Sequence, residues 1–318
     1  MALNGLLDIE LSVPDPQALA DFWLRHGLEL SSDGVLGTAS RPVQIRVAEG
    51  DHRHLSMMHL GCEQERDLHD IAERLGSLGV AASIEGTTLT CTDPVLGHRV
   101  VVEVVVAQPD PRAGAERHHN RPGEHRRLTA RASVVHEAAP RPPRRLGHFV
   151  LGSPRIGDTN AFYIGGLGYR ISDQIAGEHA TFLRCERDHH NLLVHRAPTG
   201  FLNHYALEMD DIDAVGRAGN AVLAEQPDSS VAGIGRHYLG SNVFWYLRDP
   251  AGNMFEFFCD MDQIDDDDLW DREVGRRDWG TPERPAPFST WGPPEPRDFA
   301  RQPDLADIAR AREARGLQ

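Results

Sequence analysis

The sequence of 318 residues contains no lysine, because all 33 of its basic residues are arginines. A lysine nucleophile or a lysine Schiff base is therefore excluded. Cysteine is also scarce. The four cysteines are scattered, without a CxxC pair, at Cys62, Cys91, Cys185 and Cys259. This spacing favours reduced thiols over a disulfide framework, so we expect a cytoplasmic protein.

Long apolar runs and an excess of positive charge are missing as well. No run approaches the roughly 18 apolar residues that a membrane helix needs. The first residues have no basic region and place Asp8 and Glu10 inside the apolar stretch, which disfavours a signal peptide. The net charge of −15 disfavours a nucleic-acid partner, since phosphate contact needs a basic face. With 40% hydrophobic residues, the chain is expected to be globular, with no membrane and no nucleic-acid partner.

An internal repeat indicates the architecture. Residues 7–14 align with residues 147–154, and each segment leads from an apolar strand through proline into a helix, predicted at 17–25 and 158–164. Each half also closes on an Asp-Pro turn followed by an apolar strand, at Asp93 and at Asp249. Helical spacing of apolar residues predicts further helices at 68–78 and 212–223. We therefore expect an α+β fold of tandem βαβββ modules.

Composition divides the chain further. We expect an N-terminal module over residues 1–107, a linker rich in proline and arginine over 108–144, a C-terminal module over 145–260 and a tail over 261–318. A strand is expected at 129–136 in the linker. The tail carries an acidic run and a proline-rich stretch, and a short helix is predicted at 304–315.

Three polar residues stand in otherwise apolar strands of the second half: His148, His204 and Glu256. Taken alone, each histidine is more readily a hydrogen-bonded core residue than a ligand, and Glu256 could face solvent from a half-exposed strand. A buried carboxylate, however, is costly unless it is paired or binds a metal. Together the three supply the two imidazoles and one carboxylate of the facial triad that binds Fe(II) with open coordination positions. We therefore predict a metal site at these residues.

The segment that ends at Glu256 resembles a family signature. Gly235-Arg236-His237, Trp245-Tyr246 and Asp249-Pro250-Ala251-Gly252 precede Glu256 at the spacing of the type I extradiol dioxygenases of the vicinal oxygen chelate superfamily. Trp245 departs from the usual aliphatic residue or phenylalanine but stays apolar. The resemblance covers roughly residues 1–290, and the strand around His148 is similar to that of enzymes that cleave dihydroxybiphenyl. The tail at 276–280 is similar to a segment that folds over the active site in homoprotocatechuate 2,3-dioxygenases, so we expect it to act as a lid.

The resemblance implies a reaction and roles for further residues. The chain would use Fe(II), or Mn(II) as a second choice, to insert both atoms of O2 into a catechol ring beside the diol, giving a muconic semialdehyde-type product of aromatic hydrocarbon catabolism. His190 matches the acid-base histidine, although the neighbouring His189 is an alternative. His237 and Tyr246 match the pair that hydrogen-bonds the substrate. A histidine near pKa 6.5 suits proton transfer at neutral pH.

The resemblance also suggests substrate contacts and an assembly. Val150 and Phe182 stand near the predicted site where homoprotocatechuate enzymes carry polar or larger groups, which favours an apolar or bulky catechol. Arg277 matches a tail arginine that approaches the substrate, which leaves a polar substituent open. The family is usually multimeric, so we expect a homo-oligomer.

The first module provides a comparison within the chain. Alignment of the repeats places Asp8 opposite His148, His54 approximately opposite His204, and Val101 opposite Glu256. We therefore expect the first module to bind no metal. Two other functions remain alternatives: a glyoxalase-like isomerase or lyase, which would need a second carboxylate on the metal, and a non-catalytic module that binds small molecules, as in bleomycin resistance.

Overall fold

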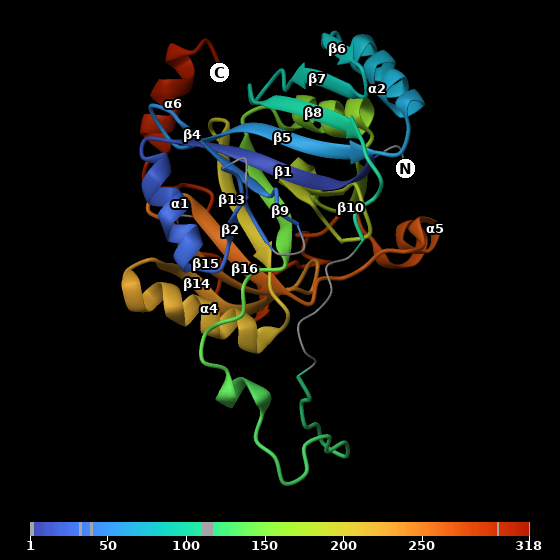
Figure 1. Cartoon of the computed structure of the whole chain (residues 1–318). Coiled ribbons are helices and arrows are strands. Elements are labelled where there is room, and N and C mark those ends of the chain that lie inside the picture. Colours follow the sequence, from blue (N-terminus) through green and yellow to red (C-terminus); the bar gives the residue numbers. More distant parts are fainter. Residues whose placement is uncertain (1–2, 32–33, 39–40, 110–116, 298, 318) are drawn as a thin grey trace.

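The computed structural model describes residues 3–31, 34–38, 41–109, 117–297 and 299–317. Two sheets dominate it, and the first sheet lies above the second in Figure 1. The first has eight strands in the order β2-β3-β4-β1-β5-β8-β7-β6, and the second has nine in the order β10-β11-β12-β9-β13-β16-β15-β14-β17. Apart from β17, the two orders match strand for strand. The structure thus confirms the α+β fold with two homologous halves.

Each half contains two βαβββ units that meet side by side, whereas the sequence predicted one such module per half. In the first half, the central strands β1 and β5 pair antiparallel, as β9 and β13 do in the second. The elements of the first half are β1 (Leu3–Val13), α1 (Pro16–Arg25), β2 (Glu29–Leu30), β3 (Leu36–Gly37), β4 (Ile45–Glu49), β5 (His54–Cys62), α2 (Glu65–Ser77), β6 (Ala82–Glu85), β7 (Thr88–Thr92) and β8 (Arg99–Val104).

The second half repeats this plan and continues into the tail. Its elements are β9 (Arg145–Ser153), α3 (Ile156–Asn160), a π-helix (Ala161–Leu167), β10 (Arg170–Ile175), a 3-10 turn (Ala176–Glu178), β11 (Ala180–Arg184), β12 (Leu192–Arg196), β13 (Phe201–Glu208), α4 (Ile212–Glu225), β14 (Ser230–His237), β15 (Val243–Arg248), β16 (Met254–Cys259), α5 (Asp267–Leu269), a π-helix (Trp270–Val274), β17 (Ser289–Trp291) and α6 (Leu305–Ala314).

Local sequence explains where helix α1 begins. The side chain of Asp15 caps it by accepting a hydrogen bond from the backbone N–H of Ala18, and Pro16 occupies its first turn. Leu19, Phe22 and Trp23 form its buried face. The same proline-led entry recurs in sequence before α3, which explains why the repeat was visible from the sequence.

The largest hydrophobic cluster among the described residues runs through both halves. Trp23 of α1 packs its ring edge against Phe255 of β16, with ring centroids 4.9 Å apart. Its indole Nε1 donates to the hydroxyl of Tyr205 on β13, which in turn donates to Asp249. The first half therefore packs against the central strands of the second half.

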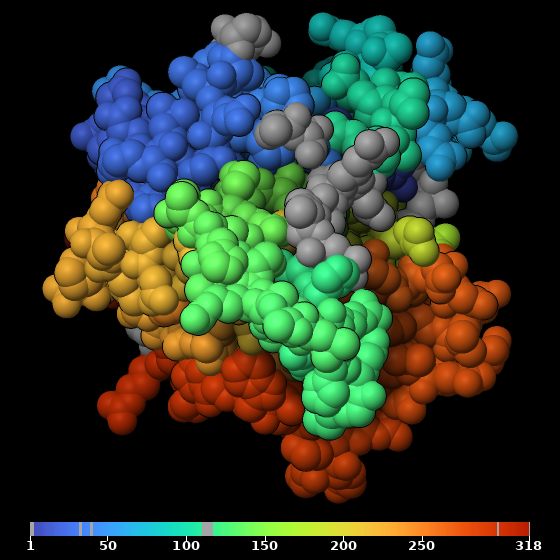
Figure 2. Space-filling model, turned by 60° about the horizontal axis from the view of Figure 1, so that its bottom comes forward, coloured from blue at the N-terminus to red at the C-terminus, as the bar shows by residue number. Residues whose placement is uncertain are grey.

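The linker and the tail both lie on the second half. Residues 117–144, green in Figure 2, run across the surface beside α4 and the tail. Ser133–His136 form a 3-10 helix, so the strand expected at 129–136 was wrong. Residues 110–116 of the predicted linker lie outside the described residues. The predicted C-terminal helix is present as α6, which returns to the first half, where Arg312 donates to the backbone carbonyl of Leu96.

Candidate metal centre and active site

The three predicted ligands lie on three adjacent strands of the second sheet: His148 on β9, His204 on β13 and Glu256 on β16. In the strand register, Ala206 of β13 pairs with His148 on one side and with Glu256 on the other. His204 is two residues from Ala206, so all three side chains share one face of the sheet. The small side chain of Ala206 leaves room between them.

These side chains converge in the interior. Nε2 of His148 lies 3.1 Å from Oε2 of Glu256, and Nε2 of His204 lies 3.4 Å from the same oxygen. All three residues are at least 98% buried. Their ligand atoms lie within 4.8 Å of one another, and this is the one group of this kind found among the described residues.

A cation fits these donors. The other oxygen of Glu256 accepts a hydrogen bond from the side chain of Asn242, and no arginine contacts Glu256 among the described residues. Nε2 of His204 is buried without a hydrogen-bond partner in the same part of the chain. A buried carboxylate and an unpaired imidazole nitrogen are costly unless a metal completes them. The residues therefore fit a divalent metal bound by two nitrogens and one oxygen.

The protonation of these groups suits metal binding. Burial lowers the pKa of His204 to about 4, so its imidazole is neutral at neutral pH. Burial raises the pKa of Glu256, but the contact with His148, followed by that with the ring of His204, outweighs this effect and holds the pKa below its usual range. Neutral imidazoles and an ionised carboxylate are the forms that bind metals.

Asn203 fixes the orientation of His204. Its Oδ1 accepts a hydrogen bond from Nδ1–H of His204 at 2.8 Å, which turns Nε2 of that ring towards Glu256. Its Nδ2 lies 3.1 Å from Nε2 of His195 and donates to the backbone carbonyl of Phe299 in the tail. Asn203, His195 and Asn242 are not among the residues predicted from the sequence, although the position of Asn203 next to a predicted ligand is a usable signal.

The three predicted catalytic residues surround the same site. The ring of His190 lies with its centroid 4.5 Å from that of His148. The hydroxyl of Tyr246 lies 2.8 Å from Nε2 of His237, whose Nδ1 lies 2.9 Å from the carbonyl oxygen of Phe288. Because a carbonyl only accepts, Nδ1 of His237 donates to it, and Nε2 accepts from the Tyr246 hydroxyl.

A cavity of about 360 Å³ opens onto these residues. Its wall is mostly apolar, and the tail contributes part of it. Among its lining residues are His148, Val150, Ile175, Ala180, Phe182, His190, Leu193, His195, His204, Leu239, Tyr246, Glu256, Pro287, Phe288, Glu295 and Phe299. The predicted contacts Val150 and Phe182 are both present. They belong to one row of paired residues, Phe182, Leu193, Val150 and His204, that crosses the sheet.

Arg277 is not brought to this cavity. Its guanidinium donates to the backbone carbonyls of Ser172 and Ile171 and forms an ion pair with Asp271. It does not occur among the described residues that line the cavity. The side chain instead fastens the tail to β10.

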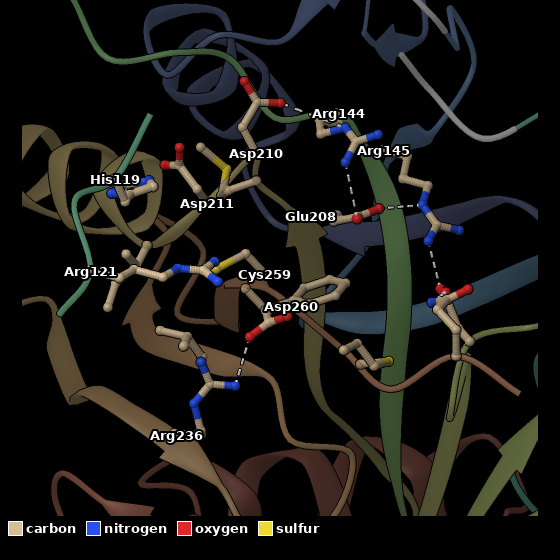
Figure 3. A pocket seen from close by; sticks show the side chains of 17 residues that line it. His119, Arg121, Arg144, Arg145, Glu208, Asp210, Asp211, Arg236, Cys259 and Asp260 are labelled. Carbon is tan, nitrogen blue, oxygen red and sulfur yellow. Dashed lines mark hydrogen bonds and ion pairs between the residues drawn. The ribbon is translucent and has the colours of Figure 1, made fainter. Parts of the chain in front are cut away.

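A larger cavity, of about 690 Å³, lies near the ends of β13 and β16. Figure 3 shows its charged side chains, many of which already bind one another: Arg144 and Arg145 both contact Glu208, and Arg236 pairs with Asp260. His119 and Arg121 of the linker approach from the opposite wall. Because its fixed charges largely neutralise each other, this cavity offers no metal-binding set comparable to the first among the described residues.

The first half shows what has replaced a metal centre at the matching place. Asp8 pairs in register with His59, and His59 pairs with Val101, so these residues match His148, Ala206 and Glu256. The counterpart of His204 is therefore Met57, and the expected match to His54 was wrong. Asp8 accepts from His59 at 2.8 Å and from Arg46 at 2.7 Å. An ion-pair cluster fills the place of the donors.

Comparisons with known proteins agree with this geometry. The family model described as the glyoxalase/bleomycin resistance protein/dioxygenase superfamily matches residues 145–257. Metapyrocatechase 2 of Cupriavidus necator is 29% identical over 313 residues, which cover 94% of this chain and 92% of that protein. An iron-dependent extradiol dioxygenase of Rhodococcus jostii is 27% identical and covers 86% of this chain and 94% of its own.

The fold has solved relatives as well. A Mn(II)-bound glyoxalase from Novosphingobium aromaticivorans superposes with a TM-score of 0.71 at 22% identity, over 95% of each chain. At this identity the similarity shows the fold alone. Residues 145–257 thus match the superfamily of glyoxalases, bleomycin resistance proteins and dioxygenases, and nearly the whole chain is similar in sequence to extradiol ring-cleaving dioxygenases.

Proposed function

We propose that the protein is an Fe(II)-dependent extradiol dioxygenase that inserts both atoms of O2 into a catechol ring beside the diol. Four electrons leave the ring carbons and enter O2, so no external reductant is needed, and the product is an open-chain muconic semialdehyde-type acid. The observation that carries the proposal is the buried set of His148, His204 and Glu256 at one end of an apolar cavity.

The three donors would hold the metal on one side and leave its other positions facing the cavity. When bound, the metal supplies adjacent positions for the catechol oxygens and O2 and a path for electrons between them. Two nitrogens and one carboxylate oxygen suit Fe(II), and Mn(II) is the second choice.

His190 is suited to act as the base. Burial lowers its pKa well below the ordinary value, and the nearby His148 lowers it further, so the ring is neutral at neutral pH. A neutral imidazole can take the proton that the catechol hydroxyl loses on binding and can later return it to the oxygen that must leave.

Tyr246 and His237 would orient the oxygens of the substrate. The pKa of Tyr246 is raised well above its usual value, by burial first and by Glu256 second, so its hydroxyl keeps its proton. In the free site that proton is donated to Nε2 of His237, which holds the hydroxyl beside the cavity. When a substrate oxygen binds, the hydroxyl would turn its proton to that oxygen and stabilise the charge that develops there.

The cavity favours an apolar substituent on the catechol. Val150 and Phe182 would contact the ring or its substituent, and Leu193 separates them in the same row. The carboxyl group of Glu295 and the guanidinium of Arg196 both line the cavity as well, so the apolar row and not the net charge sets the preference. We therefore propose catechols with alkyl or aryl substituents ahead of arylacetates.

An isomerase of the glyoxalase kind shares the fold but fits the donors less well. It would need a second carboxylate on the metal, whereas the group found among the described residues contains Glu256 alone. A non-catalytic binding module gives no reason to keep His190, Tyr246 and His237 around a metal set. Both alternatives predict that no O2 is consumed.

The decisive experiment reconstitutes the protein with Fe(II) without air and then adds catechols and O2. We expect a yellow ring-fission product and one O2 consumed per catechol. Protein that holds iron but shows neither signal across methyl-, aryl- and carboxymethyl-catechols would refute the proposal. Glu256→Gln should lose iron, whereas His190→Asn should keep iron and turn over slowly, which separates the two roles.

We also propose a cytoplasmic homo-oligomer. No helix in the described part of the chain has the length and apolar composition to cross a membrane. The four cysteines are free and buried. Light scattering on the purified protein measures the assembly, and a monomeric mass would refute that part of the proposal.

A further inference from the structure

The acid-base histidine is joined to two residues that the proposed function does not use. Nδ1 of His190 lies 3.1 Å from Nδ1 of His189, and Nε2 of His189 lies 2.8 Å from Oδ2 of Asp173. His189 is completely buried, and the other two are at least 95% buried. The three side chains thus form a hydrogen-bonded chain inside the protein.

Asp173 determines which atom donates in each of these hydrogen bonds. Its other oxygen accepts hydrogen bonds from the backbone N–H of Arg276 and from the indole N–H of Trp279, each at 2.7 Å. A carboxylate that is bound in this way can only accept, so Nε2 of His189 must donate to it. A neutral His189 then has no proton on Nδ1, and its lone pair accepts from Nδ1–H of His190.

The consequence for His190 follows from the two nitrogens of its ring. If Nδ1 carries the proton of a neutral imidazole, Nε2 carries none. His190 lines the cavity and lies against His148, so this free nitrogen is the one available to a bound catechol. The ring is then ready to accept a proton.

Neighbouring residues pack closely around these three hydrogen-bonded side chains. Asp173 pairs in the sheet with Phe182, so it continues the row of residues that lines the cavity. Ser172 donates to the backbone carbonyl of His189, and the rings of Phe182 and Trp270 lie within 6 Å of the His189 ring. Gly240 comes so close that a Cβ atom there would lie 3.1 Å from Nδ1 of His189.

We propose that Asp173 and His189 are positioning residues that hold His190 in the tautomer protonated at Nδ1, with Nε2 free for the proton of the substrate. This inference rests on the proposed function, in which His190 is the base. It also gives the tail a role, because Arg276 and Trp279 hold the carboxylate of Asp173 in place.

The tautomers can be measured without turnover. We would label the full-length protein with 15N-histidine, load it with Zn(II), and record long-range 1H–15N correlation spectra, with His189→Gln and His190→Asn as assignment variants. We expect protonated Nε2 in His189 and protonated Nδ1 in His190. A His190 protonated at Nε2, or a doubly protonated His189, would overturn the inference even if the protein is a dioxygenase.

Asp173→Asn tests the effect on catalysis. The amide oxygen should remain opposite its two donors, Arg276 and Trp279, which turns the amide nitrogen towards His189 and reverses the chain. His190 should then carry its proton on Nε2 and lose its function as a base, which lowers kcat roughly 10²–10⁴-fold, with little change in KM or iron content. An unchanged kcat in a variant with reversed tautomers would refute the positioning role.

Arg277→Ala is the matched control. It removes the guanidinium that fastens the tail to β10 but contacts none of Asp173, His189 and His190, so kcat should stay close to that of the wild type and the tautomers should not change. A fall in kcat as large as that of Asp173→Asn would show that loosening of the tail, and not the direction of the chain, is responsible. If the wild-type tautomers are as expected but no catechol is cleaved, the proposed function fails and the assignment of the tautomers stands.

Discussion

Asn203→Ala should weaken metal binding although Asn203 is not a ligand. The substitution removes the acceptor for Nδ1–H of His204, whose bond of 2.8 Å turns the ring towards Glu256. Loss of a partner that orients a ligand histidine lowers metal affinity roughly 10- to 100-fold, which corresponds to about 1.4–2.7 kcal/mol. The free ring could also rotate away from Glu256 when no metal is bound.

Anaerobic competition with a coloured chelator measures this loss. Wild type and Asn203→Ala would be titrated with Fe(II) in parallel, and kcat would be compared at saturating metal. Asn203→Asp keeps the acceptor and should retain most of the affinity. His195→Gln is the second control, because Asn203 keeps its bond to the Phe299 carbonyl. Equal affinities in wild type and Asn203→Ala would refute the reasoning.

Three further predictions follow from the geometry. Ala206→Leu should empty the metal site while the protein still folds, because the larger side chain enters the gap between the ligands at a cost of about 1–3 kcal/mol; metal analysis and urea unfolding test both parts. Arg277→Ala should leave KM for alkyl-catechols unchanged in steady-state assays, since its guanidinium binds Ser172 and Asp271 instead of the cavity. Burial lowers the pKa of His195 from 6.5 to about 4, so the unfolded chain takes up a proton first as pH falls. Between pH 7 and pH 5 this should remove about 2 kcal/mol from the free energy of unfolding of the metal-free protein, and His195→Gln, followed by urea unfolding, should abolish that share.

The sequence was sufficient for the central strands and the residues proposed as ligands. His148, His204 and Glu256 stand in apolar strands whose period of two is readable, and the repeat showed that the matching strands of the first half carry other residues. The helices were predicted for the same reason, since their apolar spacing and their caps are local signals. Interactions within one element are therefore visible without a structure.

Other contacts depend on features that sequence periodicity does not reveal. A register shift between Leu202 and His204 leaves Asn203 without a paired residue on β9, so it lies at a bulge, and its side chain reaches the ring of its neighbour. A similar irregularity separates Ile171 from Asp173. The contact between Asp173 and the tail joins residues more than one hundred positions apart. Such contacts become visible only when the sheet and the tail are folded together.

The packing of Trp23 against β13 and β16 limits how this chain can be divided. On these strands, Tyr205, Phe255 and Phe257 alternate with His204, Ala206 and Glu256, so the face opposite the proposed ligands is a set of aromatic rings that contact Trp23. A chain that began at Arg145 would expose those rings to water and lose the bond between Trp23 and Tyr205. The half in which ion pairs have replaced the donors thus supplies the wall behind the other half's chemistry. The first half therefore contributes to the packing of the second half although it lacks the donor set.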